Sequence, residues 1–276
     1  MSIKTKQNNQ AIYFRNLHNP NNPLILTNVY DAATTSLIAN HPFTKAIATG
    51  SYAIAASQGI PDDCLRLPQN LATIRSIASI LKPNEVPSHQ GQTDVSLRFP
   101  LTVDIQDGYD DIALTIREII NLGAVGCNLE DLDSNTGQLR PLPDAVHRIK
   151  AALRAAEESG VPDFVVNART DVLGCLDKAT IEDAIERGKA YLNAGACTVF
   201  VWGGAGGRGV SRGEVEKLVK AFEGRLNVKK VLREGFLTVR ELRKMGLARI
   251  SLGPELYRAA MGAFQERADA VLRDCI

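Results

Sequence analysis

The sequence has no long apolar run and almost no net charge. No stretch of its 276 residues is long and apolar enough to span a membrane, and the N-terminus lacks the apolar region of a secretory signal. The 32 basic and 31 acidic residues leave a net charge of +1, so there is no electrostatic basis for nucleic-acid or membrane-surface binding. We expect neither nucleic acid nor membrane as a partner.

Closely spaced cysteine pairs are also missing, and the four histidines have no metal-ligand spacing. Five scattered cysteines form no Cys-x-x-Cys motif, and two of them lie inside apolar, strand-like runs, where a cysteine is usually a small core residue. The cysteines are Cys64, Cys127, Cys175, Cys197 and Cys275. This pattern predicts a reduced, cytoplasmic protein without structural disulfides.

The chain does have short apolar runs that alternate with helical segments. Eight such runs read as strands: 24–28, 46–49, 101–104, 124–130, 164–169, 197–201, 226–232 and 249–253. Between them, residues 110–123 place four isoleucines on one helical face, and several helical segments end at a glycine suited to a C-cap. Regular strand–helix alternation predicts a parallel sheet. Eight units in 276 residues favour a (β/α)8 TIM barrel, one domain over 1–276.

Acidic residues gather where the predicted strands end. In "LTVDIQDGYDD" (101–111) the strand ends at Asp104, and Glu130 ends the next strand. Arg169 ends the fifth strand, and Asp62 lies in the loop after the second. Strand ends of a barrel converge on one mouth, where active sites lie, so these side chains are expected to meet. The alternative is ordinary structure: turn-forming, helix-starting or capping acids, with Arg169 as an ion-pair hub.

Two other groups of residues lie near the ends of predicted strands. The glycine-rich stretch "WGGAGGRG" (202–209) has neither a Walker ending nor a dinucleotide fingerprint, and is interpreted as a flexible loop. Lys229, Lys230 and Arg233 lie near the end of the seventh strand. One of them could reach the mouth, although solvated or packed stems are the default for such residues.

Six segments resemble the isocitrate lyase/phosphoenolpyruvate mutase superfamily, and most closely its phosphonomutase-like members. They occur in the expected order over roughly residues 12 to 265: "NVYDAATTSLI", "ATGSYAIAASQGIPD", "VDIQDGY", "GAVGCNLED", "VNARTD" and "SLGPELYRAA". The resemblance implies a (β/α)8 barrel, a Mg²⁺ site with Mn²⁺ as a substitute, and chemistry on 2-oxo acids or enolates. It also implies a homo-oligomer, a dimer or a tetramer with a swapped C-terminal helix.

The resemblance assigns roles to individual residues. Asp104 corresponds to the direct metal ligand, while Asp62, Gln106 and Glu130 are expected to hold metal-bound waters. Oxygen ligands with retained waters suit Mg²⁺. The expected substrate contacts are Arg169, Asn167 and the turn Thr49-Gly50-Ser51, and Arg169 and Glu130 are the candidate catalytic residues.

Two departures from the family pattern limit this transfer. Gln106 stands where the family usually has a second acid, which removes one negative charge, and Asp107 is expected to point elsewhere by strand alternation. The loop at 132–140 carries neither the Lys-Lys/Arg-Cys-Gly-His signature of isocitrate-type lyases nor the Lys-Thr-Asn-Ser signature of phosphonomutases. Ser134, Asn135, Thr136 and Arg140 remain possible ligand contacts, and no proton-transfer group can be named.

The leading prediction is a Mg²⁺-dependent lyase acting on a small 2-oxo or 2-hydroxy carboxylate, cleaving a C–C bond through a metal-stabilised enolate. The absent loop cysteine argues against isocitrate or methylisocitrate lyase activity itself. Phosphonomutase activity or hydrolysis of a phosphonate- or phosphoenolpyruvate-type substrate is the alternative within enzymes. A barrel that binds a metabolite without turnover is the alternative outside them, supported by Gln106 and the missing loop acid.

Overall fold

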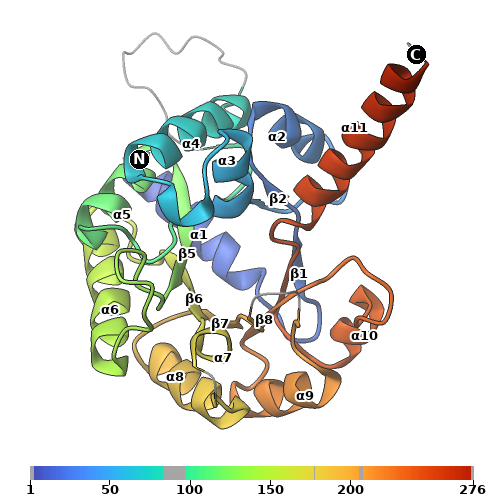
Figure 1. Ribbon diagram of the computed structural model, residues 1–276. Coiled ribbons are helices and arrows are strands. Elements are labelled where there is room, and N and C mark those ends of the chain that lie inside the picture. The colour runs from blue at the N-terminus through green and yellow to red at the C-terminus, as the bar shows by residue number, and fades with distance from the viewer. Residues whose placement is uncertain (1–2, 84–96, 177, 205–207, 275–276) are drawn as a thin grey trace, which may run out of the picture.

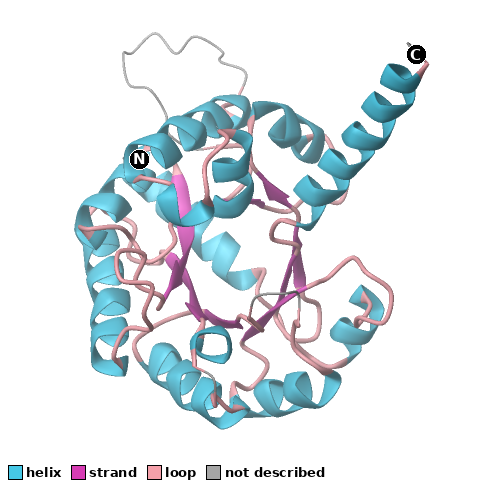
Figure 2. Ribbon diagram, viewed as in Figure 1, coloured by secondary structure: helices cyan, strands magenta, loops and turns pink. Residues whose placement is uncertain are grey.

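The strands form one parallel sheet that curves into a barrel. The computed structural model describes residues 3–83, 97–176, 178–204 and 208–274. Nine strands follow one another around the sheet in the order β1-β9-β8-β7-β6-β5-β4-β3-β2. They are β1 (Leu24–Leu26), β2 (Asn28–Val29), β3 (Ile47–Thr49), β4 (Leu101–Asp104), β5 (Ala124–Glu130), β6 (Val165–Thr170), β7 (Thr198–Val201), β8 (Leu226–Lys229) and β9 (Arg249–Ser251). The predicted (β/α)8 barrel is confirmed (Figure 2).

The first strand of the barrel is divided, which differs from the single strand expected over 24–28. β1 pairs with β9, whereas β2, one residue further on, pairs with β3. The two short pieces therefore act as one barrel strand and close the sheet. Asn28 spans this seam, because its side chain donates to the Thr49 carbonyl at 2.6 Å and accepts from the Gly253 amide at 2.8 Å. The seventh predicted strand is also shorter than expected and ends at Lys229.

Helices surround the barrel (Figure 1). They are α2 (Ala32–Ala39), α3 (Ser51–Ser57), α4 (Leu67–Leu81), α5 (Ile112–Asn121), α6 (Leu142–Glu158), α7 (Val172–Cys175), α8 (Ile181–Asn193), α9 (Arg212–Ala221) and α10 (Val239–Lys244). Local sequence sets where several of them begin. Thr180, Ser211 and Thr238 each cap a helix in a reciprocal capping box, and Asp111 caps α5.

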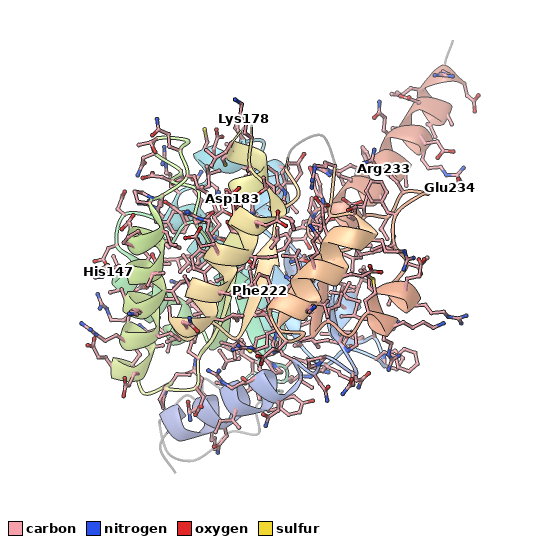
Figure 3. All side chains as sticks on the ribbon, turned by 90° about the horizontal axis from the view of Figure 1, so that it is seen from below. His147, Lys178, Asp183, Phe222, Arg233 and Glu234 are labelled. Atoms are coloured by element: carbon pink, nitrogen blue, oxygen red, sulfur yellow. The ribbon has the colours of Figure 1, made fainter. Side chains whose placement is uncertain are left out.

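An additional helix, α1 (Ile3–Asn16), closes the end of the barrel at which the strands begin. Figure 3 places α1 beneath the barrel, opposite the labelled Lys178, Arg233 and Glu234. Phe14 is fully buried there, and Gln7 donates to the carbonyls of Ile120 and Ala124 at 2.9 Å each. An interior ligand would therefore enter from the opposite end, where the described cavity lies.

The interior of the barrel is polar, while the core lies between the strands and the helices. Strand residues alternate between the two sides: Cys127 and Leu129 are buried in the apolar core, whereas Thr102 and Asn128 line an interior cavity. A packed barrel interior is usually filled by branched apolar side chains. The polar lining therefore indicates an interior built to hold a polar ligand.

The last helix, α11 (Glu255–Arg273), leaves the barrel and projects away from it (Figure 1). Beyond its first turn nearly every residue is exposed, including Met261, Phe264, Val271 and Leu272. No helix in the described ranges combines the length and the apolar character needed to cross a membrane. The four described cysteines are unpaired thiols.

Candidate active site

A cavity of about 320 Å³ opens at the carboxyl ends of the strands. Its lining comes from segments distant in the sequence, which agrees with the predicted convergence at the barrel mouth. The predicted residues that line it are Thr49, Gly50, Ser51, Asp62, Asp104 and Arg169. Three other predicted residues, Gln106, Glu130 and Asn167, lie behind this lining.

Asp104, the last residue of β4, is held in place by hydrogen bonds to both carboxylate oxygens. Its Oδ2 accepts from the Ser51 amide at 2.9 Å, and its Oδ1 accepts from Asn128 Nδ2 at 3.1 Å. The Asp104 amide donates to Thr49 Oγ1 at 2.9 Å. The carboxylate is thus fixed at the cavity wall, as a metal ligand needs to be. Because Ser51 donates its amide to Asp104, that amide is not free for a substrate carboxylate in this arrangement.

Asp62 faces Asp104 from the loop after α3. Burial and the negative charge of Asp104 raise the pKa of Asp62 to about 6. Gln106 donates its amide to the Asp62 carbonyl at 2.7 Å and to Asp62 Oδ1 at 3.3 Å. Gln106 has a positive φ of 51° and is buried, so its side chain positions Asp62 rather than facing the cavity.

Arg169, near the end of β6, is clamped between two buried carboxylates. Its Nη1 lies 2.8 Å from Glu130 Oε2, and its Nη2 lies 2.5 Å from Asp171 Oδ1. Burial raises the pKa of Glu130 well above its usual range, against the opposing effect of Arg169. Arg169 keeps one donor, Nε, without a hydrogen-bond partner in the described structure.

Two aromatic rings fix the plane of the Arg169 guanidinium. Its central carbon lies 4.9 Å from the centre of the Trp202 ring and 5.7 Å from that of Phe200. Both rings also line the cavity. Neither was predicted as a site residue, because Trp202 opens a stretch that was interpreted as a flexible loop. Residues 205–207 of that stretch lie outside the described structure.

Asn167 lies one layer below the cavity and is fully buried. It donates to Asn128 Oδ1 at 2.7 Å and accepts from Thr198 Oγ1 at 2.6 Å. Asn128 in turn donates to Asp104. A chain of side-chain hydrogen bonds thus runs from Thr198 to Asp104, and Asn167 orients that chain from below the cavity.

The donor set suits a hard cation held partly through water. No three His, Cys, Asp or Glu side chains in the described ranges lie close enough to hold an ion together. Asp104 and Asp62 nevertheless both line one cavity, and the charge of Asp104 raises the pKa of Asp62. A cation between them would relieve this repulsion. Mg²⁺, which prefers oxygen ligands and retains waters, fits that arrangement.

Asp107 points away from the cavity and anchors the loop at 132–140. It is fully buried, forms a 2.7 Å ion pair with Arg140 and accepts from Ser134 Oγ at 3.2 Å. None of Ser134, Asn135, Thr136 and Arg140 lines the cavity. The loop is therefore fixed by its own ion pairs, and its residues do not contact the space where a ligand would bind.

Other cavity residues come from the last two strands and from the start of α11. Lys229 lines the cavity, as was considered possible, and pairs with Glu255 at 3.3 Å. Arg258 joins the same glutamate at 3.5 Å and lies 4.8 Å above the Tyr52 ring. Arg258 was not predicted as a site residue, because taken alone it resembles an ordinary surface charge.

The fold and the site place this chain among the (β/α)8 barrel proteins that carry acidic and basic side chains at the carboxyl ends of their strands. Within that class, the chain belongs to the phosphoenolpyruvate phosphomutase family, whose model matches residues 14–272. The predicted superfamily is confirmed, and its members are carbon–carbon lyases and mutases.

Three relatives illustrate the range of the family. A Burkholderia cenocepacia structure provisionally named a phosphonomutase is 33% identical, with a TM-score of 0.80 over 96% of this chain and 99% of its own. The 2-methylisocitrate lyase of Escherichia coli is 29% identical over 68% of this chain and 60% of its length. A phosphonopyruvate hydrolase solved with oxalate and Mg²⁺ is 21% identical, with a TM-score of 0.76 over 96% of this chain and 87% of its own.

Proposed function

We propose that this protein is a Mg²⁺-dependent lyase that cleaves a C–C bond of a small 2-oxo or 2-hydroxy carboxylate. The observation that carries the proposal is the pairing of Asp104 with Asp62 across one cavity beside the clamped Arg169. Family membership supports it, as do the oxalate and Mg²⁺ bound by the phosphonopyruvate hydrolase. Mn²⁺ is expected to substitute for Mg²⁺.

In this proposal Asp104 would hold the Mg²⁺ ion directly, and Asp62 would hold it through a water. When bound, the ion would supply a Lewis acid that stabilises negative charge on the substrate. Arg169 binds the substrate carboxylate, since its plane is fixed by two rings and its Nε–H is unpaired. Glu130, whose pKa burial raises, is the group beside Arg169 that can hold a proton.

Mg²⁺ binding by calorimetry, with oxalate as an enolate mimic, is the test. The parent protein should bind Mg²⁺ and oxalate together, and Asp104→Ala should weaken that binding by about 100-fold or more, since outer-shell changes alone cost 10–100-fold. Asp63→Ala is the matched control, because Asp63 is an exposed acid beside Asp62 that does not line the cavity. Unchanged binding by Asp104→Ala would refute the metal assignment.

A substrate panel then separates the possible reactions. Oxaloacetate, 2-methylisocitrate and malate-type acids report lyase activity. Phosphonopyruvate reports the second candidate, phosphonomutase or phosphonate hydrolysis, which the name of the Burkholderia relative favours. No turnover on any of them, together with binding that does not need metal, would identify a metabolite-binding barrel instead.

We also propose a homo-oligomer, a dimer or a tetramer, in which α11 packs on a neighbouring copy. Phe264 is 71% exposed and Met261 is 42% exposed on a helix that the barrel does not cover. Light scattering at micromolar concentration should give a multiple of the chain mass, and Phe264→Glu should reduce it. A strict monomer would refute this.

Free cysteine thiols support a cytoplasmic location, which cell fractionation tests.

A further inference from the structure

A further cation, Arg249, lies deep in the same cavity. Arg249 begins β9, so it lies toward the closed end of the barrel, yet its side chain lines the cavity. Only 3% of Arg249 is exposed. Its Nε donates to Ser251 Oγ at 3.2 Å, and Ser251 Oγ donates to Asn227 Oδ1 at 3.1 Å. Ser251 and Asn227 line the cavity as well.

Arg249 differs from the other cations of the cavity in its partners. Arg169 is paired with Glu130 and Asp171, while Lys229 and Arg258 share Glu255. Arg249 forms no ion pair with any described residue, and its Nη1 has no hydrogen-bond partner there. Burial lowers the pKa of Arg249 to about 10, so the guanidinium remains charged at neutral pH.

A buried charge without a counter-ion is costly, and proteins normally pair it or hydrogen-bond it fully. The Thr102 hydroxyl, which lines the same cavity from β4, also lacks a hydrogen-bond partner in the described structure. The two residues that carry this unpaired guanidinium nitrogen and this unpaired hydroxyl therefore line one cavity. An anionic group with several acceptor oxygens would satisfy both.

We propose that Arg249, with Ser251, Asn227 and Thr102, forms an anion subsite deep in the cavity that binds the second carboxylate of a 2-oxo dicarboxylate. This inference rests on the proposed function, in which the other end of the ligand binds at the Asp104 site. Both sites line one cavity of about 320 Å³.

Matched pairs of ligands test the subsite. The pairs are oxaloacetate with 2-oxobutanoate and 2-oxoglutarate with 2-oxopentanoate. In each pair, the second compound has a methyl group where the first has its terminal carboxylate. Calorimetry with Mg²⁺ should give at least about tenfold tighter binding of the diacid by the parent, as expected for one charge-assisted pair. Arg249→Met should reduce this preference to about one while leaving oxalate binding in place, and Arg249→Lys should keep part of it.

Failure of the subsite can be told from failure of the metal site. Asp104→Ala should weaken both members of a pair and leave their ratio unchanged. If the parent does not bind oxalate with Mg²⁺ but still prefers the diacid through Arg249, the proposed function fails and the subsite stands. If the parent has no preference for the diacid, or if Arg249→Met retains the preference, the subsite is refuted.

The stability of the ligand-free protein gives an independent readout. Burying a charge that has no counter-ion is costly, so Arg249→Met should leave the melting temperature unchanged or raise it by about 2–4 °C. A residue retained for structure alone would behave in the opposite way. A fall of more than about 4 °C in Arg249→Met would therefore refute the assignment of Arg249 to ligand binding.

Discussion

The ion pair between Asp131 and Arg187 is buried behind the site. Asp131 is 2% exposed and lies immediately after Glu130. Its Oδ2 accepts from Arg187 Nε at 2.8 Å and from Tyr191 Oη at 2.5 Å, and its Oδ1 accepts from the Asp171 amide at 2.8 Å. Asp131 thus connects α8 to the segment that carries the clamp on Arg169.

Asp131→Ala should lower the free energy of unfolding by about 3–5 kcal/mol, because it leaves the charge of Arg187 buried without its partner. Arg187 is 8% exposed, so water compensates little for the lost carboxylate. The measurement is urea-induced unfolding followed by circular dichroism. The variant and the parent are compared with the same dependence of the unfolding free energy on urea concentration. Oxalate binding should weaken as well, since Asp131 fixes the Asp171 backbone.

Glu182→Ala is the matched control, because it breaks an ion pair with Lys217 in which both side chains are well exposed. Exposed pairs contribute little, so this variant should unfold close to the parent. The double variant Asp131→Ala, Arg187→Met should recover part of the lost unfolding free energy, because it also removes the unpaired charge of Arg187. If Asp131→Ala costs no more than Glu182→Ala, the buried pair does not stabilise the fold as argued.

Two further predictions concern the cavity. Because burial and Asp104 raise the pKa of Asp62 to about 6, protons should compete with Mg²⁺, and Mg²⁺ affinity should fall as the pH drops through 6. Asp62→Asn should flatten this dependence between about pH 5 and 7, and a flat calorimetric profile for the parent would contradict the assignment. Trp202→Leu removes the closer ring from Arg169 and should weaken oxalate binding by about three- to tenfold. Oxalate affinity equal to that of the parent would show that the stacking has no role.

The fold could be predicted from the sequence because its signals are local. Apolar runs, helical periodicity and glycine at helix ends are each set within a few residues, and together they indicated eight units. The divided first strand could not be predicted in this way. Its division depends on the pairing of Leu24 with Arg249 and of Asn28 with Ala48, which only the closed barrel determines.

Part of the cavity lining could also be predicted, because the predicted topology brings strand ends together. Asp104, Asp62 and Arg169 stand at strand ends or in the following loop, and topology alone brings them together. Gln106 lies nearby, but its amide turns toward Asp62, a consequence of side-chain geometry. Arg249 gave no signal, because an arginine at the start of a strand resembles an exposed residue until the barrel closes around it.

The seam at Asn28 has a consequence for how the molecule forms. Its hydrogen bond to Gly253 joins residues 225 positions apart, and closing so long a loop carries an entropic cost before any contact at the seam offsets it. The barrel should therefore close late in folding, after the central strands have paired. A ligand that contacts both sides of the seam would bind only the finished molecule, so recovery of ligand binding during refolding should lag behind recovery of helical signal.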